Sequence, residues 1–305
     1  MSDFKSDYWS LYVAGLTFVS ILACLLLLWI TARKKIVSHG DNTTGHVWDE
    51  DLREMNNPMP RWWMWLFVLT VVFAFGYLAV YPGLGSMPGS FGWTSVGQHA
   101  TEQAKARAET APLFAAFAAT PVPQLARNPQ AMAVGERLFA NNCATCHGSD
   151  AHGSKGFPNL TDTDWLWGGT PERIKETITM GRQGMMPPFA AAVGTAEDVR
   201  NVANYVLSLS GSAHNEIAAQ AGRPKFAVCA ACHGADGKGN QALGAPNLTD
   251  KIWLHGWGED AIVAMVTNGK TNVMPAHGQR LSAEQIHVLA AYVMSLSRSS
   301  ATAAK

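Results

Sequence analysis

Two short motifs hold the residues best able to do chemistry, Cys143-Ala-Thr-Cys146-His147 and Cys229-Ala-Ala-Cys232-His233. Each has the spacing C-x-x-C-H. Its two thiols can bond to the two vinyl groups of a haem, and the adjacent His can bind the haem iron. The sequence therefore predicts two covalently bound haem c groups. The predicted attachment residues are Cys143, Cys146, Cys229 and Cys232, and the predicted axial ligands are His147 and His233.

Zinc binding and thiol redox chemistry are the alternatives for a C-x-x-C motif. A structural zinc site needs a closed set of four Cys or His ligands, normally without a His directly after the second Cys. A thioredoxin-like pair needs one dithiol in a βαβ context, which this sequence does not suggest. Both motifs are instead followed by a Met-Pro pair, which favours haem attachment.

The two Met-Pro pairs supply the second axial ligands, Met186 and Met274. Met186 is preferred to Met185 because it precedes Pro187 and aligns with Met274, whereas Met185 aligns with an apolar residue. Two His/Met sites without an open position favour electron transfer over oxygen or peroxide chemistry, so no catalytic residue is predicted. The sequence leaves open whether each Met binds its own motif's iron or the other's. Ligation within the repeat is the simplest expectation.

The region 130–300 is an internal duplication. Pro158–Asp162 (PNLTD) recurs at Pro246–Asp250, and the apolar pattern of 196–210 recurs at 283–297. A repeat that carries its own cofactor motif indicates tandem domains and not a solenoid. We therefore predict two small helical domains, 130–211 and 212–300.

Each copy resembles a class I cytochrome c, in which helices wrap around the haem. The resemblance implies that the carbonyls of Pro158 and Pro246 accept a hydrogen bond from Nδ1–H of the axial His. It also suggests partners for the haem propionates, either the tryptophans or the basic residues at matching positions. These candidates are Trp165, Trp253, Arg182 and Lys270.

The composition points away from nucleic acid and towards a membrane. The 305 residues include 23 basic and 23 acidic side chains, so no positive field is available to bind phosphates. Charged residues make up only 15% of the chain, which is low for a soluble protein.

Two uncharged stretches near the N-terminus are long enough to cross a bilayer, about 9–31 and 62–82. Tyr or Trp residues mark both ends of each stretch, as interfacial belts require. A cleaved signal peptide and a buried core helix are the alternatives, and length and flanking charges disfavour both. The predicted organisation is a membrane anchor at 1–85 and a linker at 86–129. A linker helix is expected to start after a Thr94 or Ser95 cap.

Basic residues set the predicted orientation. The loop 33–61 contains Arg33, Lys34, Lys35, Arg53 and Arg61, whereas the N-terminus has only Lys5. By the positive-inside rule this loop is cytoplasmic, so the N-terminus and the haem domains face the periplasm of a bacterial inner membrane.

The segment 46–85 carries a family resemblance through Asn57-Pro58-Met59-Pro60-Arg61-Trp62-Trp63 and Tyr81-Pro82-Gly83. With the two haem motifs, the chain resembles the di-haem subunit, CcoP or FixP, of cbb3-type cytochrome c oxidases. Some members of this family have a single transmembrane span, whereas this sequence has two. The residues and the resemblance together predict an all-α chain with two transmembrane helices and two class I cytochrome c domains.

The resemblance also implies a role in aerobic respiration. Electrons would come from a soluble periplasmic cytochrome c and pass towards the oxygen-reducing, proton-pumping haem–copper subunit by way of a mono-haem cytochrome c subunit. The chain would serve that enzyme without being its catalytic subunit. The alternatives are a membrane-anchored di-haem shuttle, the cytochrome subunit of a periplasmic dehydrogenase, and a di-haem peroxidase.

The two predicted domains differ in charge. Residues 130–211 contain eight acidic and six basic side chains, and 212–305 contain six acidic and eight basic. A basic donor cytochrome is therefore predicted to prefer the first domain.

Overall fold

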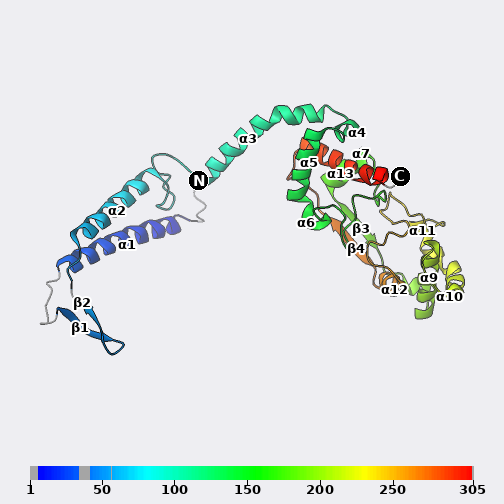
Figure 1. The fold of residues 1–305 in the computed structure, drawn as a ribbon, viewed down its shortest axis with the longest axis horizontal. Helices are drawn as coiled ribbons and strands as arrows, with labels where there is room; N and C mark the ends of the chain where they lie inside the picture. The colour runs from blue at the N-terminus through cyan, green and yellow to red at the C-terminus, as the bar shows by residue number, and fades with distance from the viewer. Residues whose placement is uncertain (1–5, 34–41, 56, 304–305) are drawn as a thin grey trace. The chain divides into compact units, whose positions relative to one another are not determined.

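The computed structural model describes residues 6–33, 42–55 and 57–303, and these are mainly helical (Figure 1). The predicted all-α class is confirmed, with two small antiparallel ribbons in addition. The chain divides into two compact units, Met1–Glu109 and Thr110–Lys305. Lys5, Lys34 and Lys35, which entered the orientation argument, lie outside the described residues.

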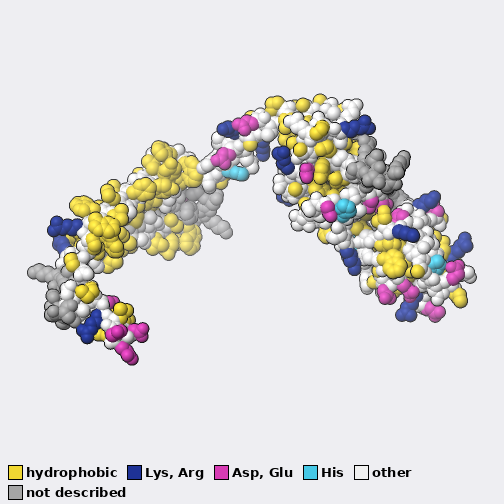
Figure 2. All heavy atoms as spheres, viewed as in Figure 1, with side chains coloured by type: hydrophobic (Ala, Val, Ile, Leu, Met, Phe, Trp, Pro, Cys, Tyr) yellow, Lys and Arg dark blue, Asp and Glu magenta, His cyan; other side chains and the backbone are white. Residues whose placement is uncertain are grey.

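The first unit contains two long apolar helices, α1 (Asp7–Arg33) and α2 (Arg61–Val80). Both are long and apolar enough to span a membrane, and Figure 2 shows apolar side chains covering them. At 1.5 Å per residue, α1 extends for about 40 Å, which exceeds a typical hydrocarbon core. Phe18 and Phe75 stack between the helices, with ring centroids 6.1 Å apart.

The loop after α2 returns to the start of α1. Ser10 is buried, and its hydroxyl accepts a hydrogen bond from the Ser86 amide at 2.8 Å. Gly85 has a φ of +63°, and a Cβ there would collide with Ser10. A glycine is therefore needed where this loop crosses the helix.

A hairpin connects the two apolar helices. Strand β1 (Thr43–Trp48) pairs with β2 (Leu52–Met55), with Val47 opposite Arg53 and Trp48 opposite Leu52. The sequence did not predict these strands, because a four-residue strand rich in charge gives no clear alternation of apolar and polar residues.

Helix α3 (Ser95–Ala118) forms the predicted linker helix, and the Thr94 hydroxyl accepts a hydrogen bond from the Gly97 amide at 2.9 Å. A short helix α4 (Val122–Leu125) follows Pro121.

The second unit contains two bodies, each with its own apolar core. Body 1 comprises residues 113–181 and 274–297, and body 2 comprises residues 186–269. The helices of body 1 are the end of α3, then α4, α5 (Pro129–Asn142), α6 (Ala144–His147), α7 (Pro171–Met180) and α13 (Ala283–Ala303). Those of body 2 are α8 (Ala190–Val193), α9 (Ala196–Leu209), α10 (Glu216–Gly222), the 3₁₀ helix η1 (Arg223–Val228), α11 (Ala230–His233) and α12 (Glu259–Asn268).

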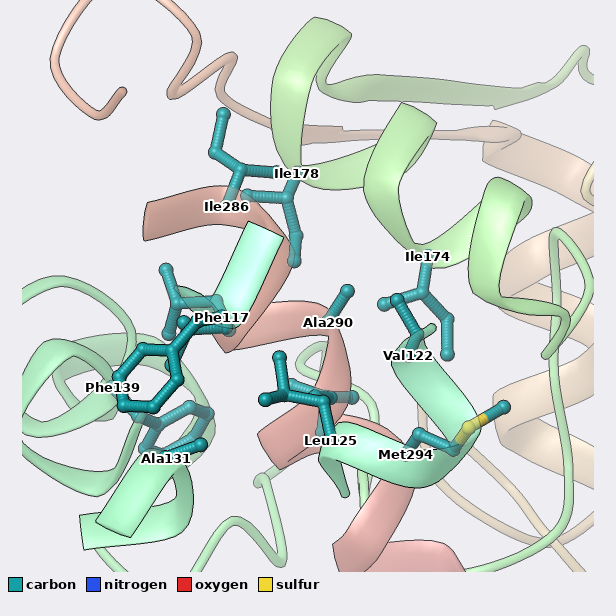
Figure 3. Packing of buried hydrophobic residues seen from close by; sticks show 14 of the residues in the cluster. Phe117, Val122, Leu125, Ala131, Phe139, Ile174, Ile178, Ile286, Ala290 and Met294 are labelled. Atoms are coloured by element: carbon teal, nitrogen blue, oxygen red, sulfur yellow. The ribbon is translucent and has the colours of Figure 1, made fainter. Parts of the chain in front are cut away.

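The C-terminal helix of the second repeat belongs to the core of body 1. In Figure 3, Ile286, Ala290 and Met294 of α13 lie among Phe139 and other side chains of the first repeat. In body 2, α9 of the first repeat packs with residues of the second, including Phe226 and Cys229. The two repeats have therefore exchanged their last helices, and the packing units differ from the sequence ranges 130–211 and 212–300.

A two-stranded ribbon joins the two bodies. Strand β3 (Arg182–Met186) pairs antiparallel with β4 (Lys270–Met274), and each strand leads the chain from one body into the other. Figure 1 shows the ribbon between the α5–α7–α13 group and the α9–α10–α12 group. Because each repeat contributes one strand, the crossing is nearly two-fold symmetric. The Phe189 amide donates to the Val266 carbonyl, and at the equivalent position the His277 amide donates to the Ile178 carbonyl.

Candidate haem-binding sites

Each C-x-x-C-H motif forms one helical turn. Helix α5 ends at Asn142, directly before Cys143, and α6 carries Cys146 and His147. The His147 amide donates a hydrogen bond to the Cys143 carbonyl at 3.0 Å. In body 2, Cys229 precedes α11, which carries Cys232 and His233. The equivalent hydrogen bond, from the His233 amide to the Cys229 carbonyl, is also 3.0 Å long. One turn therefore presents both thiols and the imidazole of each motif.

The helix that leads into the first motif begins at a strong cap. The Asn128 side chain accepts hydrogen bonds from the amides of Gln130 and Ala131, and Pro129 occupies the first helical position. The second motif follows a shorter lead. Helix α10 is capped by Asn215, and its last residue, Gly222, is followed by a 3₁₀ segment that contains Pro224. A proline interrupts helical hydrogen bonding, which explains why the lead to the second motif is broken.

His147 and His233, the predicted axial ligands, are both buried, each with 9% of its surface exposed. Nδ1 of His147 lies 3.0 Å from the Pro158 carbonyl oxygen, and Nδ1 of His233 lies 3.0 Å from that of Pro246. A carbonyl can only accept, so the proton of the neutral ring is on Nδ1 and the Nε2 lone pair is free. Burial lowers the pKa of both imidazoles, which favours this neutral, metal-binding form.

The first thiol of each motif is not activated as a nucleophile. Burial raises the pKa of Cys143 to about 11, and burial likewise raises the pKa of Cys229. Reactive dithiols of the thioredoxin type need a lowered pKa instead. The four cysteines are unpaired, as attachment to a haem requires.

The ribbon explains why Met186, and not Met185, points into a core that contains a C-x-x-C-H motif. Side chains alternate along a strand, and Met186 packs into the core of body 2 whereas Met185 is 69% exposed. The same alternation turns Met274 into body 1 and leaves Val273 66% exposed.

The two methionines lie in exchanged positions. Met274 packs in the core that contains Cys143 and Ala144 of the first motif. Met186 packs in the core that contains Cys229 of the second motif. This arrangement differs from ligation within the repeat, the simplest expectation from the sequence. No periodicity could have revealed it, because two copies of one pattern are compatible with either pairing.

Two glycines make the crossing possible. Gly181 has a φ of +71°, and a Cβ there would collide with the backbone of Met274. Gly269 has a φ of +67°, and its Cβ would lie 2.6 Å from the Met186 carbonyl oxygen. A side chain at either position would force the strands apart at the turn that leads to each methionine.

Buried polar atoms test whether the cores suit a haem. Trp253, which packs in the core of body 2, has a buried Nε1–H without a partner among the described residues. An unsatisfied buried donor costs about 1–3 kcal/mol, and a propionate oxygen would satisfy it. Body 2 therefore offers a haem both an apolar core for the ring and a hydrogen-bond donor for a propionate.

Arg182 has a similar vacant donor at Nη2. Its Nε donates to Thr177 at 2.9 Å and its Nη1 to Glu176 at 3.0 Å, and the guanidinium stacks over Trp167 at 5.1 Å. Hydrogen bonds from Arg182 and Arg173 lower the pKa of Glu176 to about 2. The equivalent Lys270 is exposed, so of this pair Arg182 is the better candidate for a propionate.

Three further described histidines, His255, His277 and His287, have contacts or surroundings of their own. His277 is buried, and its Nδ1 lies 2.9 Å from the Pro275 carbonyl oxygen. Nε2 of His287 lies 2.8 Å from the Thr120 carbonyl oxygen and therefore ties α13 to the end of the linker. Burial lowers the pKa of His255, with smaller contributions from Lys270 and Lys155.

Comparisons with known proteins agree with the two-part organisation. The family model described as the N-terminal domain of cytochrome oxidase-cbb3, FixP, matches residues 40–88. The model for cytochrome c oxidase, cbb3-type, subunit III matches residues 130–206 and again 218–293.

Three named relatives extend these matches over most of the chain. The cbb3-type cytochrome c oxidase subunit CcoP of Rubrivivax gelatinosus is 66% identical over 305 residues, which is 100% of both chains. The subunit FixP of Azorhizobium caulinodans is 46% identical and covers 84% of this chain and 93% of its own length. FixP of Bradyrhizobium diazoefficiens is 42% identical, covering 84% of this chain and 95% of its own.

Proposed function

Because the chain belongs to the CcoP/FixP family of cbb3-type cytochrome c oxidase subunits, we propose that it carries two covalent haem c groups and relays electrons within that oxidase. The donor is a soluble periplasmic cytochrome c. The electrons pass towards the oxygen-reducing haem–copper subunit by way of the mono-haem cytochrome c subunit. The chain itself contributes no catalytic residue.

The observation that carries this proposal is the pair of matched sites in the two bodies. Each has two thiols and a buried imidazole on one turn, a carbonyl that fixes the proton on Nδ1, and a methionine from the ribbon. When bound, each haem iron cycles between ferric and ferrous states and so carries one electron. Both axial positions are filled by protein, which suits electron transfer.

The packing supports an exchanged set of axial ligands. We assign His147 and Met274 to the haem attached at Cys143 and Cys146. The haem attached at Cys229 and Cys232 is assigned His233 and Met186. The ribbon β3–β4 would then link the two haem sites, because it carries both methionines: Arg182 pairs with Met274, and Met186 pairs with Lys270.

The basic residues of the segment between α1 and α2 support a topology in the bacterial inner membrane. Arg33, Arg53 and Arg61 lie in or next to this segment, and we infer from them that the segment is cytoplasmic. The N-terminus and both haem bodies are then periplasmic, where haem c is attached and a soluble donor can reach it.

Solubilised membranes test the proposal. On a native gel, the haem-stained band that contains this chain should coincide with in-gel cytochrome c oxidase activity, and pyridine haemochrome analysis should give two haems per chain. A haem-stained chain that migrates alone, together with full oxidase activity in a strain that lacks it, would contradict the proposal. Reduction of the purified chain by an alcohol or sulfur substrate would favour a dehydrogenase subunit instead.

A further inference from the structure

The hairpin between α1 and α2 exposes large apolar side chains on both faces. Trp48 and Leu52 are directly opposite one another and are 56% and 64% exposed. On the other face, Val47 is 49% exposed and Met55 is 59% exposed. Such side chains on a ribbon this short have no core of their own to enter.

The hairpin is poorly suited to stand alone in water. A single two-stranded hairpin is marginally stable at best. Its turn places Asp49 at a φ of 49° and Glu50 at 73°, and left-handed non-glycine residues cost about 1–3 kcal/mol each. Its side-chain hydrogen bonds include two that converge on Glu54, from the Thr44 hydroxyl at 3.0 Å and Trp48 Nε1 at 3.1 Å. The bond from Nε1 holds the Trp48 indole in an exposed position, which is the arrangement expected of a contact residue.

The charge of the hairpin selects the kind of surface that covers it. Residues 42–57 contain four acidic side chains, Asp49, Glu50, Asp51 and Glu54, against one arginine. Figure 2 shows acidic side chains gathered at the end of the hairpin. The cytoplasmic leaflet is itself negatively charged and repels such a turn. Cytoplasmic loops of membrane proteins are rich in Lys and Arg and attract it.

An open apolar surface continues into the two spans. A groove of about 540 Å³ lies between them, at the ends to which the hairpin segment is joined. Trp29 and Ala32 of α1 and Met64 and Trp65 of α2 are among its lining residues. A partner that spans the membrane can fill this groove and present its own loops to the hairpin.

We propose that the β1–β2 hairpin docks on the cytoplasmic face of the membrane-embedded haem–copper subunit. Trp48 and Leu52 pack against its loops, and the acidic turn meets Lys or Arg side chains there. The inference rests on the proposed function and on the cytoplasmic placement of residues 33–61. It adds an anchoring site on the side of the membrane opposite to the haems.

Site-specific photocrosslinking in the intact oxidase tests the contact. Trp48 is replaced by p-benzoylphenylalanine, and the adduct formed on irradiation is mapped by mass spectrometry. A matched probe replaces Ile217, which is 82% exposed in body 2. The proposal expects the probe at 48 to join cytoplasmic loop peptides of the haem–copper subunit, and the probe at 217 to join none of them.

Charge reversal tests the electrostatic part. Asp49→Lys, Glu50→Lys and Asp51→Lys are combined, a change that adds basic residues to a loop already predicted to be cytoplasmic and so preserves the topology. Asp150→Lys, Glu172→Lys and Glu216→Lys make the same change of charge in the haem bodies. We expect the first set to lower retention on the tagged haem–copper subunit by roughly two- to tenfold at about 0.3 M salt, and the second set to leave retention unchanged.

The outcomes separate this inference from the proposed function. If the chain co-purifies with active oxidase but the probe at 48 labels lipid or a second copy of this chain, the docking site is wrong and the function stands. Unchanged retention of the turn variant, with two haems still attached, also overturns the docking site. If the unmodified chain does not co-purify with the haem–copper subunit, the proposed function itself fails.

Discussion

Body 1 and body 2 reach the same local geometry around the C-x-x-C-H motif with different helices. Body 1 enters its motif from the 14-residue helix α5, whereas body 2 uses the seven-residue helix α10 and a 3₁₀ segment. Even so, the Nδ1 to carbonyl distance is 3.0 Å in both. The helix that leads to the motif is thus free to vary. The motif turn, the Pro-Asn-Leu-Thr-Asp loop and the ribbon strand are kept.

The bodies also differ beside the haem sites. Body 1 has the buried imidazole of His277 where body 2 has Phe189, and His277 contributes to lowering the pKa of His147. The Arg182 guanidinium lies over the Trp167 ring, and this ring lies close to Gly244. At the position equivalent to Trp167, the other repeat has His255. Two haems with such different neighbours are expected to have different reduction potentials.

The largest expected effect is a loss of folding stability when a buried residue of an exchanged helix is truncated. Leu289 of α13 and Val202 of α9 are equivalent and fully buried. Leu289→Ala should destabilise body 1 by about 2–5 kcal/mol, and Val202→Ala should destabilise body 2 by about 0.8 kcal/mol less, for one carbon fewer. Limited proteolysis with mass spectrometry checks the location. Leu289→Ala should expose cleavage sites in 130–181, and new cleavage confined to 212–269 would contradict the exchange.

The crossing glycines should have matched effects. Gly181→Ala and Gly269→Ala each add a backbone collision to a left-handed residue, so each should cost about 2–4 kcal/mol. Gly211, with a φ of +64° and nothing within 4 Å, is the control. Gly211→Ala should cost about 1–2 kcal/mol for its conformation alone. Thermal loss of the low-spin haem spectrum measures all three. Equal losses of stability at Gly211 and Gly181 would show that a Cβ at Gly181 does not collide with the backbone of Met274, and would contradict the close crossing.

A smaller effect is expected at the propionate candidate of body 2. Trp253→Phe removes a donor that would reduce the negative charge of a propionate. The more negative propionate stabilises ferric over ferrous haem, so the reduction potential of the second haem should fall by roughly 20–40 mV. Trp165→Phe is the matched change in body 1, where no buried vacant indole donor is found among the described residues. Spectroelectrochemical titration resolves the two haems. A potential that stays constant in Trp253→Phe would remove this residue from the site.

The smallest effect concerns donor docking. Counted over the bodies as they pack, body 1 has seven acidic and six basic residues and body 2 has seven and five. The charge contrast between the ranges 130–211 and 212–305 therefore largely disappears. A basic donor cytochrome then has no electrostatic reason to prefer the first body. Glu172→Lys and Glu216→Lys should each slow association of a basic donor less than about threefold. Stopped-flow reduction checks this, and a much larger effect at one site would locate the docking face there.

The sequence was sufficient where chemistry is local. Cys143, Cys146 and His147 are close in the chain, so their spacing alone places them on one turn. The helical pattern predicted α1, α2, α3 and α9 for the same reason. Pairing between distant segments could not be predicted in this way. Met186 and Met274 have the same local pattern, and only the antiparallel ribbon decides which body each one enters.

The exposure of the hairpin's apolar side chains and the vacant donors could not be predicted from the sequence either. Trp253 has the same local pattern as Trp165, and only its surroundings leave Nε1 without a partner. The sequence shows that Val47 and Trp48 are apolar, and only the fold shows that both are exposed.

The most direct test of the account counts low-spin haems in double variants. If His147 and Met274 bind one iron, His147→Ala with Met274→Ala should leave one haem with intact His/Met spectra. His147→Ala with Met186→Ala should leave none. Low-temperature electron paramagnetic resonance of the purified oxidase, with haem content from pyridine haemochrome, gives the count. The reverse result, in which the first pair abolishes both signals and the second preserves one, would contradict the exchanged arrangement.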